Sequence, residues 1–181
     1  MELLVLNTNF QSVYVIDTFK SMIWTDRYKA YGDFELYLPM DSGLLDFLKE
    51  DYYLWTKDSE HCMIIEDLSI DSDVEEGNFL TVTGRSLESI LERRIIWGQK
   101  TLKGNLQEEI QTLLNESIIN PAIIDRKIDN FIFESSVDPK ITELTVDTQF
   151  TGDNLYTVIT NLCTSNNIGF KIVLNDNNQF V

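Results

Sequence analysis

Residues 24–39, WTDRYKAYGDFELYLP, decide the fold class of this chain. Phe34, Leu36 and Leu38 alternate with less apolar residues, and Met22 and Trp24 alternate in the same way just upstream. A period of two is typical of antiparallel strands that bury one face. The stretch therefore predicts a β-hairpin with one apolar face.

The polar centre of the same stretch allows two interpretations, a ligand-binding cluster or a solvated hairpin end. Its charged residues are Asp26, Arg27, Lys29, Asp33 and Glu35. Gly32 and Asp33 supply a permissive turn, and Pro39 ends the pairing because it lacks an N–H. Cross-strand charge pairs are worth only a few tenths of a kcal/mol each. We interpret the centre as a solvated hairpin end with such pairs, which leaves room for a protein–protein contact beside its aromatic residues.

The first hundred residues contain further hairpin signals. We expect paired strands at 3–7 and 13–17, and at 61–74 and 79–84 around a turn at 75–78, with another strand at 52–55. Asp41 or Ser42 should cap a short helix that places Leu44, Leu45 and Leu48 on one side. Closely spaced hairpins favour a small barrel or sandwich. The sequence thus predicts an antiparallel, β-barrel-like domain over 1–100 with a helical insertion at about 41–50.

The sequence pattern changes near Ser86. An N-cap and two helical turns are expected there, followed by a strand at 95–98. Asn105 should begin a helix, with Glu108 as its capping-box partner. A second helix should start at 151–154 and end near Gly169. The apolar stripes of these helices are Leu106, Ile110, Leu113 and Leu114, and Leu155, Val158, Ile159, Leu162 and Cys163.

Further strands are expected at 131–133, around 143–146 and at 170–174. The last of these precedes a turn and a returning strand that begins at 179–181. We therefore expect an α/β region over 101–181 that is incomplete at its C-terminus, because half a strand leaves its neighbour's backbone groups unpaired. The whole chain is predicted to be α+β and rich in β-structure.

Composition limits the function classes. The 181 residues include 43% hydrophobic residues, which suits a folded protein. Thirty acidic residues against fourteen basic ones give a formal net charge of −16. Such a surface repels nucleic-acid phosphates, so sequence-specific nucleic-acid binding is disfavoured. The apolar runs are too short to cross a membrane, and residues 1–10 do not resemble a signal peptide.

The candidate catalytic and metal-binding residues carry weak signals. His61 and Cys62 are adjacent and should point to opposite faces of a strand, so they do not form a catalytic pair. Cys62 and Cys163 lie in apolar runs and are expected to be buried free thiols. Ser86 and Ser89 lack a histidine partner. A single histidine also leaves a zinc site short of its usual ligands.

The acidic residues include possible calcium ligands and possible acid–base pairs. Asp71, Asp73, Glu75 and Glu76 superficially resemble a calcium loop, but the positions of glycine and of the expected final glutamate do not fit. Glu66 with Asp67, and Glu134 with Asp138, are pairs that thirty scattered acids produce by chance. Asn115 begins a glycosylation sequon within a predicted helix. We predict no catalytic, cofactor or metal site, and no enzymatic activity.

Several segments together resemble tail proteins of siphophages and of their prophages in Gram-positive bacteria. They are TDRYKAYGDFELYLP, YYLW, MIIEDLSI, LTVTGRSLESILERRIIWG and TGDNLYTVI, and they span nearly the whole chain in order. The resemblance implies the N-terminal part of a tail hub or baseplate protein. Such hubs are trimeric rings in which β-barrel domains alternate with α/β insertions around a channel. It also implies chains longer than this one, and it assigns no catalytic residue to this part.

Three functions remain open at this point. The first is a structural protein of the virion tail, assembled in the bacterial cytoplasm, that forms a homotrimeric ring between tail tube and tip. Its partners would be distal-tail, tape-measure, fibre or lysin proteins. The second is the scaffold of a cell-wall hydrolase whose activity lies outside these residues. The third is a carbohydrate-binding module, although burial explains most of the aromatic residues more simply.

Overall fold

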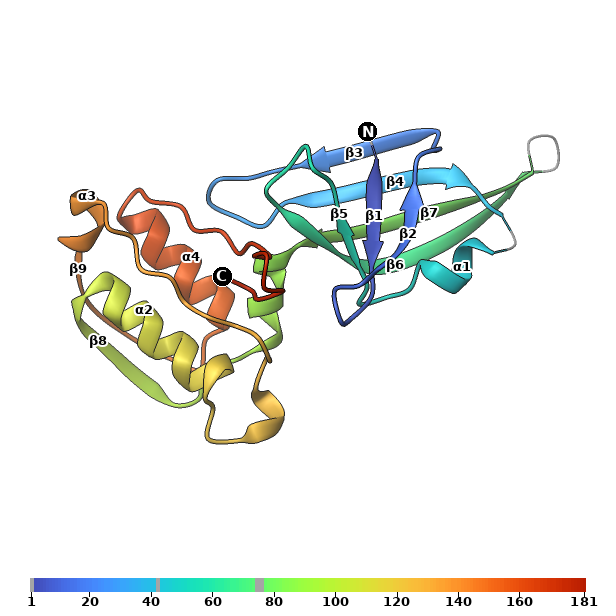
Figure 1. The fold of residues 1–181 in the computed structure, drawn as a ribbon. Helices are drawn as coiled ribbons and strands as arrows, with labels where there is room; N and C mark the ends of the chain where they lie inside the picture. The colour runs from blue at the N-terminus through green and yellow to red at the C-terminus, as the bar shows by residue number, and fades with distance from the viewer. Residues whose placement is uncertain (1, 42, 74–76) are drawn as a thin grey trace. The chain divides into compact units, whose positions relative to one another are not determined.

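The computed structural model describes residues 2–41, 43–73 and 77–181, and the chain divides into two compact units. Unit 1 comprises residues 1–87 with 171–173, and unit 2 comprises 88–170 with 174–181. The sequence suggested a boundary near residue 100, whereas the contacts place it after Leu87. Figure 1 shows the elements of each unit.

Unit 1 is built on one seven-stranded antiparallel sheet in the order β2-β1-β5-β6-β7-β4-β3 (Figure 1). The strands are β1 (Leu3–Leu6), β2 (Ser12–Ile16), β3 (Ser21–Thr25), β4 (Asp33–Pro39), β5 (Tyr53–Trp55), β6 (Cys62–Asp73) and β7 (Gly77–Ser86). The order is open, and among the described residues no strand pairing closes it into a barrel. The expected antiparallel, β-rich architecture is confirmed, whereas the closed barrel is not found.

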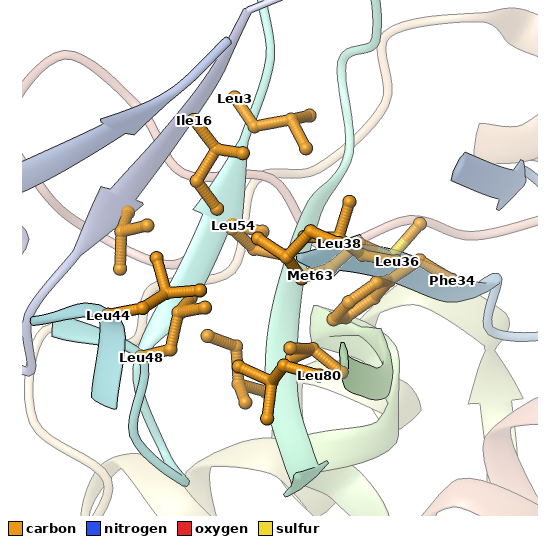
Figure 2. Close-up of a cluster of buried hydrophobic side chains, with 13 residues drawn as sticks. Leu3, Ile16, Phe34, Leu36, Leu38, Leu44, Leu48, Leu54, Met63 and Leu80 are labelled. Atoms are coloured by element: carbon orange, nitrogen blue, oxygen red, sulfur yellow. The ribbon is translucent and has the colours of Figure 1, made fainter. Parts of the chain in front are cut away.

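One hydrophobic cluster collects residues from both ends of this open sheet. Leu3 and Ile16, from the β2–β1 end, share it with Phe34, Leu36 and Leu80, and Met22 and Trp24 of β3 pack against it. Figure 2 shows the labelled side chains of β1, β2, β4, β5, β6, β7 and α1 gathered together. Strands as far apart as β1 and β3 reach the same cluster only if the sheet is strongly curved. The sheet therefore curves around one shared hydrophobic cluster.

The hairpin at residues 24–39 forms as the alternation predicts. β3 and β4 pair antiparallel, with Trp24 opposite Phe34 and Thr25 opposite Asp33. Phe34, Leu36 and Leu38 are buried, and Glu35 between them is exposed. β1 with β2, and β6 with β7, also pair as expected. Period-two patterning was sufficient to place β4 and the face that it buries.

Gly84 lies where β7 passes between β4 and β6, opposite Phe34 and Ile65. The β6–β7 register shifts between Ile65 and Asp67, which leaves Glu66 in a bulge. A Cβ atom on Gly84 would lie 1.8 Å from the carbonyl oxygen of Ile64 and 2.8 Å from Cε1 of Phe34. Glycine is required here because the neighbouring backbone occupies the space of any side chain.

The short helix α1 (Leu44–Phe47) differs in detail from the expected one. Its N-cap is Gly43, with no side-chain hydrogen bond, instead of Asp41 or Ser42, and Ser42 lies outside the described residues. Leu44 and Leu48 belong to the core, but Leu45 is 37% exposed. Only the two leucines four positions apart share the inward face, as helix geometry requires.

Unit 2 contains a two-stranded antiparallel sheet of β8 (Gln99–Asn105) and β9 (Thr145–Thr151). Its α-helices are α2 (Leu106–Leu114), α3 (Pro139–Thr142) and α4 (Leu155–Ser165), and α2 continues as a π-helix over Asn115–Ile119. Two 3-10 helices cover Leu87–Arg93 and Ile124–Arg126. α2 packs against both strands of the sheet. None of the helices in the described ranges is long and apolar enough to span a membrane.

The two longer helices begin and bury residues as predicted. The Asn105 side chain accepts hydrogen bonds from the backbone N–H groups of Gln107 and Glu108, and Asn154 caps α4 in the same way. All residues of both predicted apolar stripes are buried. The end of α4 was placed too late: the helix stops at Ser165, and Asn167, with φ of 55°, provides the left-handed termination expected of Gly169.

Four strand predictions for the second half were wrong in extent. The helical turns expected after Ser86 form a 3-10 helix over Leu87–Arg93, and Ser86 Oγ accepts a hydrogen bond from the backbone N–H of Gly32, 2.7 Å away. The strands expected at 95–98, 131–133 and 170–174 are reduced to isolated bridges at Ile95, Phe131 and Leu174. The strand expected around 143–146 runs from Thr145 to Thr151. Short apolar runs do not reveal whether a pairing partner extends beside them.

Candidate interaction surfaces

Arg27, Asp33 and Asp26 at the polar end of the β3–β4 hairpin take part in local contacts. Arg27 forms an ion pair with Asp33 at 2.6 Å and donates to the carbonyl oxygen of Tyr31. Asp26 accepts hydrogen bonds from Trp24 Nε1 and Ser59 Oγ. The hydrogen bond from Arg27 holds the pKa of Asp33 below its ordinary value of 3.8. This arrangement is the solvated hairpin end that the sequence predicts.

Glu66, the first residue of the Glu66–Asp67 pair, takes part in a structural contact. Glu66 accepts two hydrogen bonds from Arg85, at 2.7 Å from Nε and 2.8 Å from Nη2. The Arg85 guanidinium also lies 4.7 Å from the ring centroid of Tyr31. A carboxylate held by both oxygens in a planar fork is fixed in orientation, so Glu66 ties the bulge of β6 to Arg85.

The nucleophilic side chains are buried. Cys62 and Cys163 are free thiols, and burial raises the pKa of Cys62 to about 12 and that of Cys163 to about 11. Ser86 and Ser89 are 0% and 2% exposed. Since a thiolate is the reactive form of cysteine, thiols with such raised pKa values are poor nucleophiles near neutral pH. The expectation of buried free thiols is confirmed.

The remaining acidic candidates do not converge. Asp71 accepts a long hydrogen bond from Thr81 Oγ1 on the neighbouring strand, whereas Glu75 and Glu76 lie outside the described residues. Asp138 caps α3 by accepting from the N–H of Lys140. Within the described part of the chain, no group of three or more His, Cys, Asp or Glu side chains is placed to hold a metal ion.

Unit 2 carries a shallow groove of about 550 Å³ beside the π-helix. It is lined by Gln111, Thr112, Asn115, Glu116, Ile119, Phe131, Ile132 and Phe133. Glu116 in its wall pairs with Lys100, and the Asn115 amide oxygen accepts a hydrogen bond from Asn120. The groove thus has a mixed lining in which Glu116 and the Asn115 amide oxygen already have partners.

The outer face of the unit 1 sheet presents a row of four residues, which we call the acidic row: Ile23, Glu35, Thr83 and Asp67. They lie side by side across β3, β4, β7 and β6, as the registers show. Ile23 is 56% exposed, and Glu35 and Asp67 are exposed as well. Neither carboxylate forms an ion pair with any residue that the structure describes. Neighbouring strands are about 4.8 Å apart, so the two carboxylate-bearing backbones are about 10 Å apart.

Unit 2 carries a second exposed cluster, which we call the arginine–tryptophan patch: Arg94, Ile95, Trp97, Ile124 and Arg126. Arg94 Nε donates to the carbonyl oxygen of Arg126, at 2.8 Å, and Arg126 Nη2 donates to that of Ile95, at 2.6 Å. The Arg126 guanidinium lies 4.7 Å from the ring centroid of Trp97. Trp97 is 66% exposed, and Ile95 and Ile124 are 52% and 73% exposed.

The backbone beneath this patch is firmly held. The carbonyl oxygen of Arg94 accepts from the N–H of Leu155 at the start of α4, and the N–H of Ile96 donates to Asp153. Ile128, just after the 3-10 helix at Ile124–Arg126, donates to Ile118 of the π-helix. The patch is not predictable from ERRIIWG, which indicates only a helix end followed by a strand. A tryptophan preceded by two arginines was the available signal.

Known proteins resemble this chain in sequence and in fold. The model of the Siphovirus ReqiPepy6 Gp37-like protein family matches residues 2–180. The chain belongs to this family. No curated protein matches it. The resemblance to siphophage and prophage tail proteins is thereby confirmed.

Two solved structures share the fold. Prophage tail protein gp18 from Listeria monocytogenes EGD-e is 15% identical, with a TM-score of 0.64 over 100% of this chain and 50% of that one. The tail protein from Neisseria meningitidis MC58 is 12% identical, with a TM-score of 0.58 over 99% of this chain and 49% of that one. This member of the Gp37-like family therefore spans about half the length of both structures.

Proposed function

We propose that this chain is a structural protein of a siphophage tail and forms part of a hub ring between the tail tube and the tip. The observation that carries the proposal is the family match over residues 2–180, joined to a fold shared along the whole chain with two tail proteins. Family membership and both neighbours support a structural role in the tail. The ring, its three copies and its place in the tail are our inference from the resemblance.

The net charge fits a ring that conducts DNA. Three copies at −16 each carry a formal charge of −48. A channel wall of the same sign as the phosphates would keep the genome from adhering during passage. We therefore expect carboxylates to gather on the channel face of the assembled ring. A neutral channel in the structure of a trimer would contradict this mechanism.

We propose a non-enzymatic role for the same residues. The thiols are buried, Ser86 Oγ accepts from a backbone N–H, and Glu66 is held by Arg85. These contacts assign the candidate groups to structure. Incubation of the purified chain with Gram-positive cell walls should leave their turbidity unchanged, and clearing of the walls would overturn this part of the proposal.

The experiment that tests the tail assignment is electron microscopy of phage particles labelled with an antibody against this chain. We expect gold particles at the distal end of the tail tube. A particle preparation from a phage lacking the gene serves as the control for antibody specificity. Label on the capsid, or virions that lack the chain altogether, would contradict a tail role.

A further inference from the structure

We propose that the arginine–tryptophan patch of one copy docks onto the acidic row of a second copy of this chain. The inference rests on the proposed function, because a ring needs a contact between copies, and it identifies the two surfaces that make that contact. The patch lies in unit 2 and the row lies in unit 1, so the contact is heterologous. A heterologous contact generates a closed ring when its rotation closes.

The chemistry of the patch favours a protein partner with exposed carboxylates. Neither Arg94 nor Arg126 forms an ion pair with any residue that the structure describes; both donate to backbone carbonyl groups. Arg94 and Arg126 also carry like charges side by side. A carboxylate from outside would relieve that repulsion and would be bound by planar, bidentate donors.

The patch also has the composition of an interface centre. Tryptophan and arginine are the residue types most enriched where binding energy concentrates, and isoleucine supplies apolar area around them. Its guanidinium groups are held by carbonyl oxygens and by the Trp97 ring, so less side-chain freedom is lost on binding. The backbone beneath is fixed by the start of α4. The patch is thus ready to bind without rearrangement.

Charge complementarity selects a second copy as the partner. Each copy has thirty acidic and fourteen basic residues, so the surface that it offers to a cationic patch is strongly acidic. Within it, the acidic row combines two carboxylates without ion pairs, about 10 Å apart, with an exposed isoleucine. Two guanidinium groups beside apolar side chains match two carboxylates beside an apolar side chain.

Nearby acidic residues lower the net positive charge around the arginine–tryptophan patch but do not cancel it. Asp125 belongs to the same 3-10 helix, Glu92 lies in the preceding helix, and Asp129 pairs with Lys127 at 3.0 Å. The local balance is therefore only weakly positive. This balance favours short-range pairing with positioned carboxylates over attraction to the uniform charge of DNA.

The test is a charge swap followed by sedimentation velocity of the 181-residue chain. Arg94→Glu with Arg126→Glu should weaken self-association about thirtyfold or more, as expected for hot-spot residues. Glu35→Arg with Asp67→Arg should weaken it similarly. A mixture of the two double variants should associate more strongly than either variant alone. The unaltered patch of one variant then meets the unaltered row of the other, and the reversed patch meets the reversed row with restored charge complementarity.

Controls separate folding from binding. Ile124→Asp changes a residue that is 73% exposed and should weaken association with unaltered circular dichroism. Lys57→Glu with Lys140→Glu makes the same change in net charge at exposed lysines elsewhere and should leave association unchanged. An effect of the lysine control equal to that of the arginine variant would overturn the proposal, because net charge alone would then explain the loss.

Failure of this inference is distinguishable from failure of the proposed function. If the wild-type chain associates and neither charge reversal nor Ile124→Asp has an effect, these two surfaces do not form the contact between copies. The proposed ring would not be contradicted by that result. A wild-type chain that is monomeric at every concentration would overturn both. Retardation of duplex DNA by the wild-type chain, abolished by Arg94→Glu with Arg126→Glu, would show that the patch takes phosphate and would also overturn the proposal.

Discussion

At the residue scale, Gly84 shows how closely the sheet of unit 1 is packed. The bulge at Glu66 brings the carbonyl oxygen of Ile64 to within 1.8 Å of the place that a Cβ on residue 84 would take. The atom in the way is backbone and cannot rotate aside. Gly43, in contrast, has open space around its Cβ position and a right-handed backbone with φ of −93°.

Gly84→Ala should therefore lower the free energy of unfolding of unit 1 by about 2–4 kcal/mol, because the strands must move apart to admit a methyl group. Gly43→Ala, the matched control, should change it by less than about 1 kcal/mol. Urea unfolding followed by tryptophan fluorescence measures both. Equal effects of the two substitutions would show that the close approach at Gly84 is not a constraint.

The Arg27–Asp33 ion pair gives a pH dependence whose sign is set by the lowered pKa of Asp33. A carboxyl whose pKa is lower in the folded chain than its ordinary 3.8 stabilises the fold above that value. The contribution is lost as the pH falls through the lowered pKa. Arg27→Gln should shift the NMR titration of Asp33 back toward 3.8 and reduce stability at neutral pH but not in strong acid. An unchanged Asp33 titration in this variant would contradict the assignment.

The two thiols provide a test of burial. Because burial raises the pKa of Cys62 to about 12 and that of Cys163 to about 11, the native chain should react very slowly with a thiol reagent at pH 8. Two thiols per chain should react promptly in denaturant. Rapid reaction of the folded chain with either cysteine would show that its surroundings open in solution.

At the element scale, β4 and the two longer helices were predictable from their apolar periods, whereas elements with few buried residues were not. Phe34, Leu36 and Leu38 were enough to place β4 and its buried face. β8, QKTLKGN, has Leu102 as its one buried residue and was missed, because its pairing with β9 comes from residues far away in the sequence. The helical turns expected after Ser86 form a 3-10 helix at Leu87–Arg93, and apolar spacing over seven residues does not separate this form from an α-helix.

The N-cap of α2 is the element-scale prediction most open to measurement. Asn105 accepts from two backbone N–H groups of the first turn, and its amide donates to the carbonyl oxygen of Thr142 at 2.6 Å. Asn105→Ala removes both roles and should cost about 1–2 kcal/mol. Asn105→Asp keeps the accepting oxygen and should cost less.

Far-UV circular dichroism during urea unfolding measures both variants of Asn105. The comparison isolates the capping bonds, because both variants lose the donation to Thr142. Equal losses from the alanine and aspartate variants would mean that the bond to Thr142, and not the cap, holds the start of α2.

For the molecule as a whole, the sequence indicated the protein family but not the surfaces that could bind a partner. The resemblance of several segments led to the tail family, which the match over residues 2–180 shows. The arginine–tryptophan patch was not foreseen, because Arg126 reaches Ile95 and Trp97 only through the tertiary fold.

We expect copies of this chain to assemble with one another into a ring. Sedimentation equilibrium of the purified 181-residue chain measures its mass in solution without a calibration of shape. Our account predicts a species of about 63 kDa, three times the 21.0 kDa of one chain. A mass of 21.0 kDa that persists as the concentration is raised would contradict it.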